Sequence, residues 1–130
     1  MRTPPLRMVL AIVVLAGLVA APAFAAKPRT TVEILGAGTS NPKPLYFQGT
    51  VRSHKRYCEK ERKVTLYRAR SGKDKRVGAK RAEPDEYGGW VWEVEVSTPQ
   101  LGNYYGKAEK THRCRGDKSE KFKLDDPIWE

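Results

Sequence analysis

Hydrophobic and polar residues alternate along much of this chain, with a period of two. The pattern is clearest in Leu45–Arg52 and Trp90–Val96. In the second stretch the apolar positions are Trp90, Trp92, Val94 and Val96, while Val91, Glu93 and Glu95 fall between them. A period of two is typical of a β-strand with one buried face. Large aromatic residues dominate burial in small domains, so we expect this Trp-rich face to lie in the core rather than to form a carbohydrate platform.

Shorter alternating stretches and turn sequences divide the rest of the chain into strands. Val64 and Leu66 alternate with Lys63, Thr65 and Tyr67. Val77 and Ala79 alternate more weakly, and Phe122 and Leu124 mark a last strand. Thr31–Ile34 is compatible with a short strand, while Gly36–Pro44 has the composition of a turn or linker. Pro84–Gly89 has that of a hairpin, and no segment shows sustained helical periodicity. Short strands separated by turns predict an all-β fold, a small antiparallel β-sandwich of about seven strands.

The first 25 residues have the three regions of a cleavable secretory signal peptide. Arg2 and Arg7 supply positive charge, Met8–Ala21 is uncharged, and Ala23–Ala25 gives the small-x-small pattern of a cleavage site. The alternative is a membrane anchor, but Pro22 ends the apolar run short of the twenty or so residues that span a bilayer. We therefore expect cleavage after Ala25 and a secreted or periplasmic protein with no stable membrane insertion.

Removing the signal peptide leaves one small domain. We expect an N-terminal strand and linker over residues 26–44, the sandwich over 45–125, and a tail over 126–130 in which Trp129 is exposed. The chain has 25 Lys and Arg and 15 Asp and Glu, and two of the basic residues lie in the signal peptide, which leaves 23 − 15 = +8. A chain of this length supports a single modest core, to which a covalent cross-link would add much stability.

Cys58 and Cys114 are the two cysteines of the chain. In an oxidising compartment, two cysteines in a small secreted domain predict a structural disulfide. The alternatives use the same thiolates. His54, Cys58, His112 and Cys114 offer four zinc ligands, and a Cys with a His base is a nucleophile pair. Because a disulfide consumes both thiolates, we expect no metal site and no Cys nucleophile. The sequence has no other catalytic constellation and no cofactor fingerprint, so we expect no cofactor and no catalytic residue.

Positive charge is concentrated between Arg52 and Arg81. This block holds thirteen Lys or Arg against Glu59, Glu61 and Asp74. Such a patch attracts polyanions, and outside the cytoplasm we expect anionic cell-surface polymers rather than nucleic acid. The competing interpretation is a solvated surface that keeps the protein soluble and blocks edge pairing. The candidate polyanion-binding residues are Arg56, Arg68, Arg70, Lys73, Lys75 and Arg76.

Several motifs after Phe47 resemble those of small secreted bacterial proteins with a transthyretin-like, carboxypeptidase-regulatory-like domain. The matching positions are Phe47, Gly49, Val51, Ser53, Cys58, Arg62, Val64, Leu66, Tyr67, Gly89, Trp90, Gly102, Tyr104, Tyr105, Cys114 and Ser119. The resemblance implies an immunoglobulin-like or transthyretin-like sandwich, with Cys58 and Cys114 joining the loop before one strand to the segment after the penultimate one. It implies no activity, because this fold serves many functions.

The residues leave three functions open. The first is a non-catalytic secreted module with a binding or structural role at the cell exterior. The second is a polyanion-binding protein that uses the Arg52–Arg81 block. The third is an enzyme or enzyme inhibitor whose site has no sequence motif and would need a concave pocket with convergent polar groups. We expect no hydrolysis of 5-hydroxyisourate, because the transthyretin-like enzymes with that activity rely on histidines, an arginine and a Tyr-Arg-Gly-Ser ending. This chain ends in Asp126-Pro127-Ile128-Trp129-Glu130, and its two histidines lie beside the cysteines.

Overall fold

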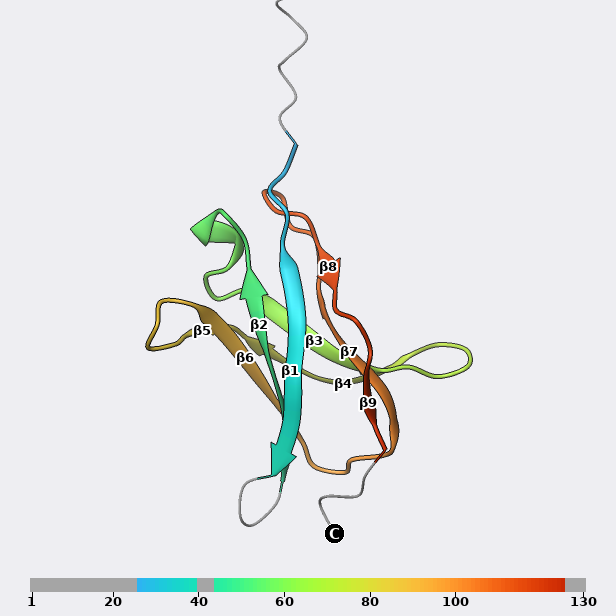
Figure 1. Ribbon diagram of the computed structural model, residues 1–130. Coiled ribbons are helices and arrows are strands. Elements are labelled where there is room, and N and C mark those ends of the chain that lie inside the picture. Colours follow the sequence, from blue (N-terminus) through green and yellow to red (C-terminus); the bar gives the residue numbers. More distant parts are fainter. Residues whose placement is uncertain (1–25, 40–43, 126–130) are drawn as a thin grey trace, which may run out of the picture.

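The computed structural model describes residues 26–39 and 44–125 (Figure 1). The predicted signal peptide, the predicted tail and Trp129 lie outside the described residues. The described part contains nine strands and one short 3-10 helix. They are β1 (Thr31–Thr39), β2 (Leu45–Arg52), η3 (Arg56–Cys58), β3 (Lys63–Arg68), β4 (Lys75–Arg81), β5 (Glu83–Pro84), β6 (Trp90–Val96), β7 (Gly102–Ala108), β8 (Asp117–Lys118) and β9 (Phe122–Leu124).

The strands form two antiparallel sheets that pack as a sandwich, which confirms the predicted all-β fold. Sheet A has the order β1-β2-β6-β5. Sheet B has the order β4-β3-β7-β8, and β9 pairs with β7 beside β8. The count of nine exceeds the predicted seven or so mainly because β5 and β8 are two-residue strands, too short to show an alternation.

The core lies between the sheets, on the apolar faces that the alternation predicts. Trp92, Phe47 and Tyr104 are the largest side chains that are fully buried. The rings of Phe47 and Tyr104 lie 4.6 Å apart, so the two sheets meet through an aromatic contact. The four alternating apolar residues of β6, Trp90, Trp92, Val94 and Val96, are all buried, which confirms that the Trp face belongs to the core.

Gly49 makes room for the Trp92 ring. Gly49 pairs with Trp92 across the β2–β6 ladder. A Cβ at position 49 would lie 2.0 Å from the Glu33 carbonyl oxygen and 2.4 Å from Trp92 Cζ2. Real Cβ atoms do not approach other atoms this closely, so the close packing of β1, β2 and the Trp92 ring requires a glycine here.

β1 is longer than the predicted Thr31–Ile34 and includes residues 36–39, which composition assigned to a turn. Its pairing with β2 shifts between Ile34 and Gly36, where Leu35 is the extra residue of a β-bulge. Near the start of β1, the Val32 amide donates to Asp117 Oδ2 at 2.7 Å. The bulge and this carboxylate both interrupt the free edge of β1, which limits pairing with other chains.

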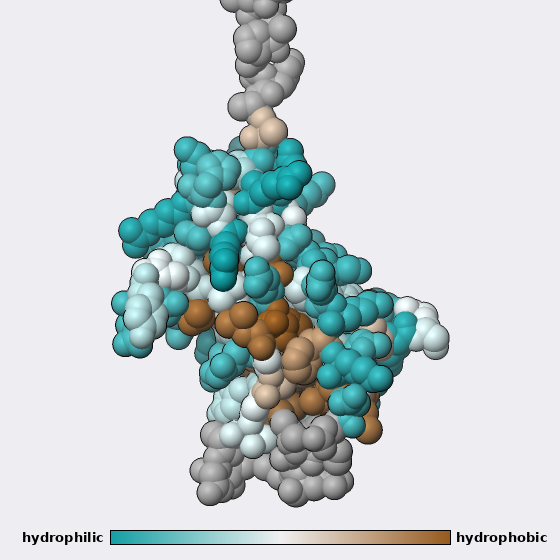
Figure 2. Space-filling view, in the orientation of Figure 1, coloured by the Kyte–Doolittle hydropathy of each residue, from teal (hydrophilic) through white to brown (hydrophobic). Residues whose placement is uncertain are grey.

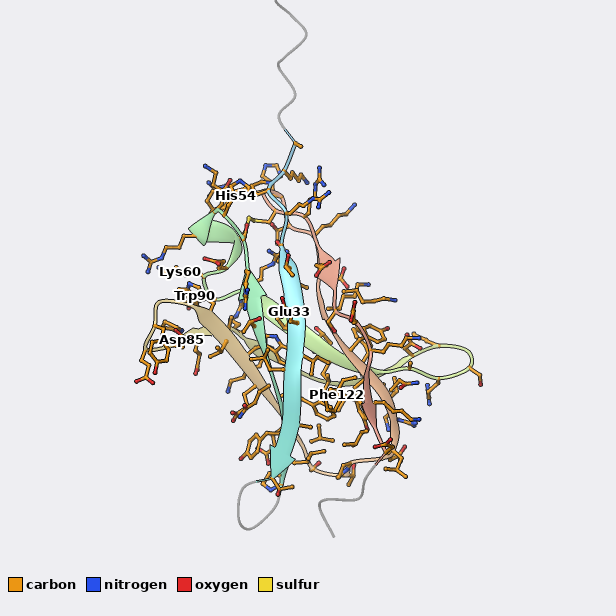
Figure 3. All side chains as sticks on the ribbon, viewed as in Figure 1. Glu33, His54, Lys60, Asp85, Trp90 and Phe122 are labelled. Atoms are coloured by element: carbon orange, nitrogen blue, oxygen red, sulfur yellow. A yellow bond between two sulfur atoms is a disulfide. The ribbon has the colours of Figure 1, made fainter. Side chains whose placement is uncertain are left out.

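The surface divides into a hydrophilic and a more apolar part. In Figure 2, hydrophilic residues cover the end of the molecule near η3, and hydrophobic residues gather over β1 and toward β9. Leu35 is 62% exposed, and Ile34 and Phe122 are partly buried against the core. Glu33 on β1 and Phe122 on β9 mark this region in Figure 3. The part of the chain that the structure describes has no helix with the length and hydrophobicity of a membrane span.

Candidate functional site

A disulfide joins η3 to the loop after β7. Cys58 and Cys114 are bonded with a Cα–Cα separation of 5.7 Å, which confirms the predicted pairing. Both sulfur atoms are therefore unavailable to a zinc ion or as a nucleophile. We call the region formed by residues 53–62 and 109–116 the disulfide end. His54 and Lys60 lie in this region near η3 (Figure 3).

A buried arginine holds the same loops together from inside. Arg62 is 7% exposed. Its Nη1 donates to Thr30 Oγ1 and to the Cys58 carbonyl, both at 2.9 Å. Its Nη2 donates to the carbonyls of Glu109 at 2.8 Å and Arg115 at 2.9 Å. One guanidinium group thus links the segment before β1, η3 and both sides of the loop after β7.

The positive charge of Arg62 has no carboxylate partner in these bonds. All four acceptors are neutral oxygen atoms, so they satisfy the N–H groups without cancelling the charge. Burial lowers the pKa of Arg62, because desolvation disfavours the charged form. The guanidinium stays protonated at neutral pH, since an arginine ionises far above it. The disulfide end therefore contains a permanent, uncompensated positive charge.

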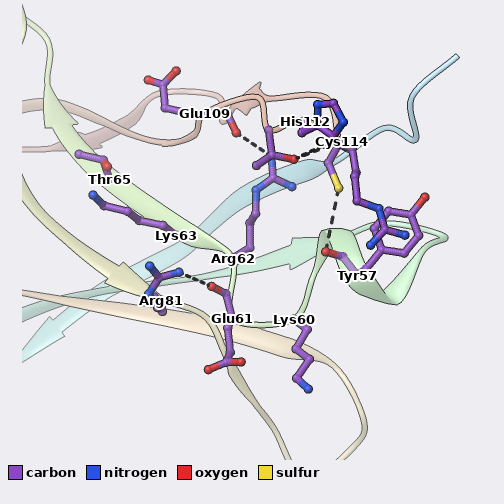
Figure 4. Close-up of a pocket in the computed structure, with 12 residues that line it drawn as sticks. Tyr57, Lys60, Glu61, Arg62, Lys63, Thr65, Arg81, Glu109, His112 and Cys114 are labelled. Carbon is purple, nitrogen blue, oxygen red and sulfur yellow. Dashed lines mark hydrogen bonds between the residues drawn. The ribbon is translucent and has the colours of Figure 1, made fainter.

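A pocket of about 510 Å³ opens beside this arginine (Figure 4). The loop before β3 contributes Tyr57, Lys60 and Glu61, and the sheet contributes Lys63 and Arg81. Arg62, Thr65, Glu109, Thr111, His112, Arg113 and Cys114 complete the lining. Five of these side chains are Lys or Arg and two are Glu, so the pocket is net positive and suited to an anion.

The register of sheet B gathers further positive charge on its outer face. Leu66 and Tyr104 point into the core, so Thr65, Tyr67 and Tyr105 point outward. Directly paired residues share a face, and residues two apart on one strand do so as well. The outer positions of sheet B therefore include Lys63, Arg76, Arg81, Lys107, Lys118 and Lys123, which we call the basic face.

The outer face of sheet A carries the opposite charge. Trp92 and Val94 point into the core, so the residues between them point outward. Register places Glu33, Glu83, Glu93 and Glu95 on this side, together with Arg52. Among the described residues, Lys107–Glu109 at 3.2 Å is the only ion pair. The acidic residues on the outer face of sheet A and the basic residues on the outer face of sheet B are therefore mostly unpaired within the described part of the chain and lie on opposite sides of the sandwich.

Tyr105 anchors the β3–β4 hairpin to the basic face. Its hydroxyl donates to Asp74 Oδ2, and Asp74 Oδ1 accepts from the Arg70 amide at 3.1 Å. The Tyr67 ring stacks on Tyr105 at 5.4 Å, and Lys118 Nζ lies 4.7 Å from the Tyr105 ring centre. Burial and the Asp74 carboxylate raise the pKa of Tyr105 to about 12. The hydrogen bond from Tyr105 lowers the pKa of Asp74.

The structure does not bring the six predicted polyanion-binding residues together at one place. Arg76 lies on the basic face, and Arg70 and Lys73 lie in the adjoining β3–β4 hairpin loop. Arg68 and Lys75 pair with each other on the inward side of sheet B, in a groove near the β6–β7 loop that Arg76 also lines. Arg56 lies on η3, before the start of β3. β3 spans roughly 17 Å, so Arg56 is far from the hairpin.

Several residues of the site lie outside the predicted set. Lys107, Lys118 and Lys123 belong to the second half of the chain, whose net charge is negative, and Lys60, Lys63, Arg81 and Arg113 line the pocket. Alternation placed Lys63 opposite Val64, so its outward orientation was available from the sequence. The three lysines of β7, β8 and β9 join the face only through strand pairing, which local sequence does not specify.

Tyr57 occupies the rim of the pocket. It is 41% exposed, and the Arg113 guanidinium carbon lies 3.7 Å from its ring centre.

Comparison of the chain with protein-family models, curated proteins and solved structures finds no match. The function must therefore be inferred from the geometry of the basic face and the pocket.

Proposed function

We propose that this chain is a secreted, non-catalytic β-sandwich module that binds anionic polymers at the cell exterior through its basic face. The observation that carries the proposal is the separation of charge between the two outer faces of the sandwich. A charged surface that only keeps a protein soluble has no need for such sorting, because mixed charges serve that purpose. A continuous positive face beside an open pocket instead suits an extended polyanion.

The compartment and the family are part of the same proposal. The Cys58–Cys114 disulfide is compatible with an oxidising compartment, and the first 25 residues resemble a signal peptide. The two-sheet architecture is of the kind that the transthyretin-like, carboxypeptidase-regulatory-like resemblance implies. That family relationship accounts for the sandwich, while the charge distribution supplies the proposed binding role.

Retention on immobilised heparin, a sulfated polysaccharide, tests the proposal. The face variant is Arg76→Gln/Lys118→Gln/Lys123→Gln, which removes three charges from the outer side of sheet B. The matched control, Lys27→Gln/Lys55→Gln/Lys80→Gln, removes three charges from positions outside that face. Both have the same net charge, so they separate a binding surface from charge in general.

We expect the face variant to elute at lower salt than the control. If the three side chains bind the polymer, the slope of log affinity against log salt should fall by about one for each anionic group that is no longer neutralised. The thermal stability of both variants should stay close to that of the wild type, because exposed charges contribute little to folding. Equal elution of the two variants would contradict the proposal and leave the basic residues as a solvating surface.

A further inference from the structure

The pocket at the disulfide end differs from the rest of the basic face in shape and in composition. The face is a sheet surface, whereas the pocket encloses about 510 Å³ between the loop before β3 and the loop after β7. This volume lies in the range of small-molecule sites and exceeds what a bare phosphate or sulfate needs. Lys63 and Arg81 belong to both regions, so the pocket is continuous with the face.

We infer that this pocket binds one sugar-sized unit carrying an oxyanion, as a subsite for the polymer that lies along the basic face. The inference rests on the proposed function and specifies its ligand. The oxyanion would be a phosphate, sulfate or carboxylate group, and the unit a single ring of a polysaccharide or one of its ends.

The charge around the pocket favours the oxyanion. Arg62 supplies a buried positive charge that its own hydrogen bonds leave uncompensated. Arg81 uses one N–H on the Glu61 carbonyl at 3.2 Å, which holds its guanidinium at the pocket with further donors. Lys60 and Lys63 add charges that make no ion pair within the described residues. An anion bound here would offset the cost of burying Arg62.

The rim of the pocket favours a ring next to that anion. Tyr57 lines the pocket and is 41% exposed. The Arg113 guanidinium lies against its ring, which fixes the orientation of both groups. Arg113 covers one face of this ring, and the part that stays exposed is an apolar surface of the kind on which the C–H face of a sugar can pack. The hydroxyl groups of the sugar would meet Thr111 and Glu109 in the same wall.

Titration calorimetry with small ligands tests the inference without the polymer. The probes are glucose 6-phosphate, glucuronic acid, inorganic phosphate and neutral glucose. We expect the two anionic sugars to bind more tightly than phosphate, and neutral glucose to bind weakest. The pocket variant Lys60→Gln/Arg113→Gln should weaken glucose 6-phosphate binding by about tenfold or more. The matched variant Lys118→Gln/Lys123→Gln removes two charges from the face alone and should change that binding by less than about twofold.

A third variant separates the ring from the anion. Tyr57→Ala should weaken glucose 6-phosphate binding by about tenfold and inorganic phosphate binding by less than about twofold, because the phenol ring packs on the sugar and not on the anion. Equal binding of phosphate and glucose 6-phosphate would refute a sugar-sized site. Equal weakening by the pocket and face pairs would refute the location.

The two proposals fail in different ways. If heparin retention depends on the basic face but neither anionic sugar binds, the pocket inference is wrong and the proposed function stands. If the anionic sugars bind in the pocket while the face variant and its control elute from heparin together, the polymer-binding function is wrong and the pocket is a small-molecule site.

Discussion

The core and the disulfide end of this protein are held together by different kinds of interaction. In the core, Phe47, Trp92 and Tyr104 fill the space between the sheets. At the disulfide end, a covalent bond and the four hydrogen bonds of Arg62 join loops that bury little apolar surface. The core is mainly apolar, and its polar atoms, such as the Trp92 indole nitrogen and the Tyr104 hydroxyl, bond to backbone carbonyls. The disulfide end is rich in charged side chains and carries the pocket.

This difference has a consequence for function. Apolar packing alone favours an interior with no open pocket. A pocket lined with cations keeps its shape only if its walls are held in place, so that they neither collapse together nor move apart. The disulfide and Arg62 fix those walls with little apolar packing, so the site can stay charged and open. We therefore expect the two regions to respond differently to substitution, in stability and in binding.

The largest effect should come from overpacking the core at Gly49. Gly49→Ala places a methyl group 2.0 Å from the Glu33 carbonyl oxygen and 2.4 Å from the Trp92 ring. We expect the free energy of unfolding to fall by more than about 4 kcal/mol, as measured by urea denaturation. Gly38→Ala is the control, because a Cβ there meets no atom within 4 Å. A change of similar size in both variants would contradict the packing argument.

Removing the disulfide should have the next largest effect. Cys58→Ser/Cys114→Ser opens a loop of 56 residues, for which chain entropy predicts a loss of about 4 kcal/mol. The sheets should persist, because their core lies elsewhere, so far-ultraviolet circular dichroism should keep its β-sheet signature at low temperature. Loss of both sheets under native conditions would show that core and disulfide end are not separate.

Substituting Arg62 should destabilise the disulfide end specifically. Arg62→Met keeps much of the side-chain volume but leaves the carbonyls of Cys58, Glu109 and Arg115 without this donor. We expect a loss of about 2–4 kcal/mol in the free energy of unfolding. Faster hydrogen exchange should be confined to residues 53–62 and 109–116.

A double-mutant cycle sharpens this result. The disulfide and Arg62 constrain the same two loops, so the combined variant should lose less stability than the sum of its parts. Strict additivity would mean that the covalent and polar links act on different parts of the molecule.

The smallest effect concerns pH and the outer face of sheet B. The raised pKa of Tyr105, about 12, means that the folded state favours the neutral phenol. Its contribution to stability is complete below the ordinary tyrosine pKa of about 10 and is lost as pH rises through about 12. In Tyr105→Phe, unfolding free energy should therefore fall less steeply between pH 10 and 12. When absorbance at 295 nm is followed against pH, the variant should also lack the ionisation step of the tyrosine that titrates near pH 12 in the wild type.

Much of the fold could be predicted from local sequence, and part of β1 could not. The alternation of Trp90–Val96 identified a buried face, because period-two burial is a local property of a strand. Residues 36–39 were predicted to form a turn because Gly36 and Gly38 favour turns. In the structure, pairing with β2 holds these residues in an extended strand. β5 and β8 were missed because two residues have no pattern. The transthyretin-like relationship and the signal peptide stay predictions.

The positive charge of the candidate site could be predicted from the sequence, but the set of residues that form it could not. The sequence showed a basic block, and Arg76 with the hairpin residues Arg70 and Lys73 does lie on or beside the basic face. Arg56 does not, because β3 carries the chain away from η3 before the hairpin begins. Lys118 and Lys123 come from the acidic half of the chain, and their place depends on pairing with β7.

The amino-acid sequence alone identified which residues are buried in the main strands, that two cysteines were available to pair, and that the stretch from Arg52 to Arg81 is strongly basic. These are properties of composition and of the period-two geometry of a strand. The tertiary structure decided which charges share a surface and what Arg62 contacts, because both depend on residues far apart in the chain. Arg62 lies between Glu61 and Lys63 in the sequence, yet its hydrogen-bond partners lie as far away as Thr30 and Arg115. Only folding brings those oxygen atoms together and leaves the charge of Arg62 facing a pocket.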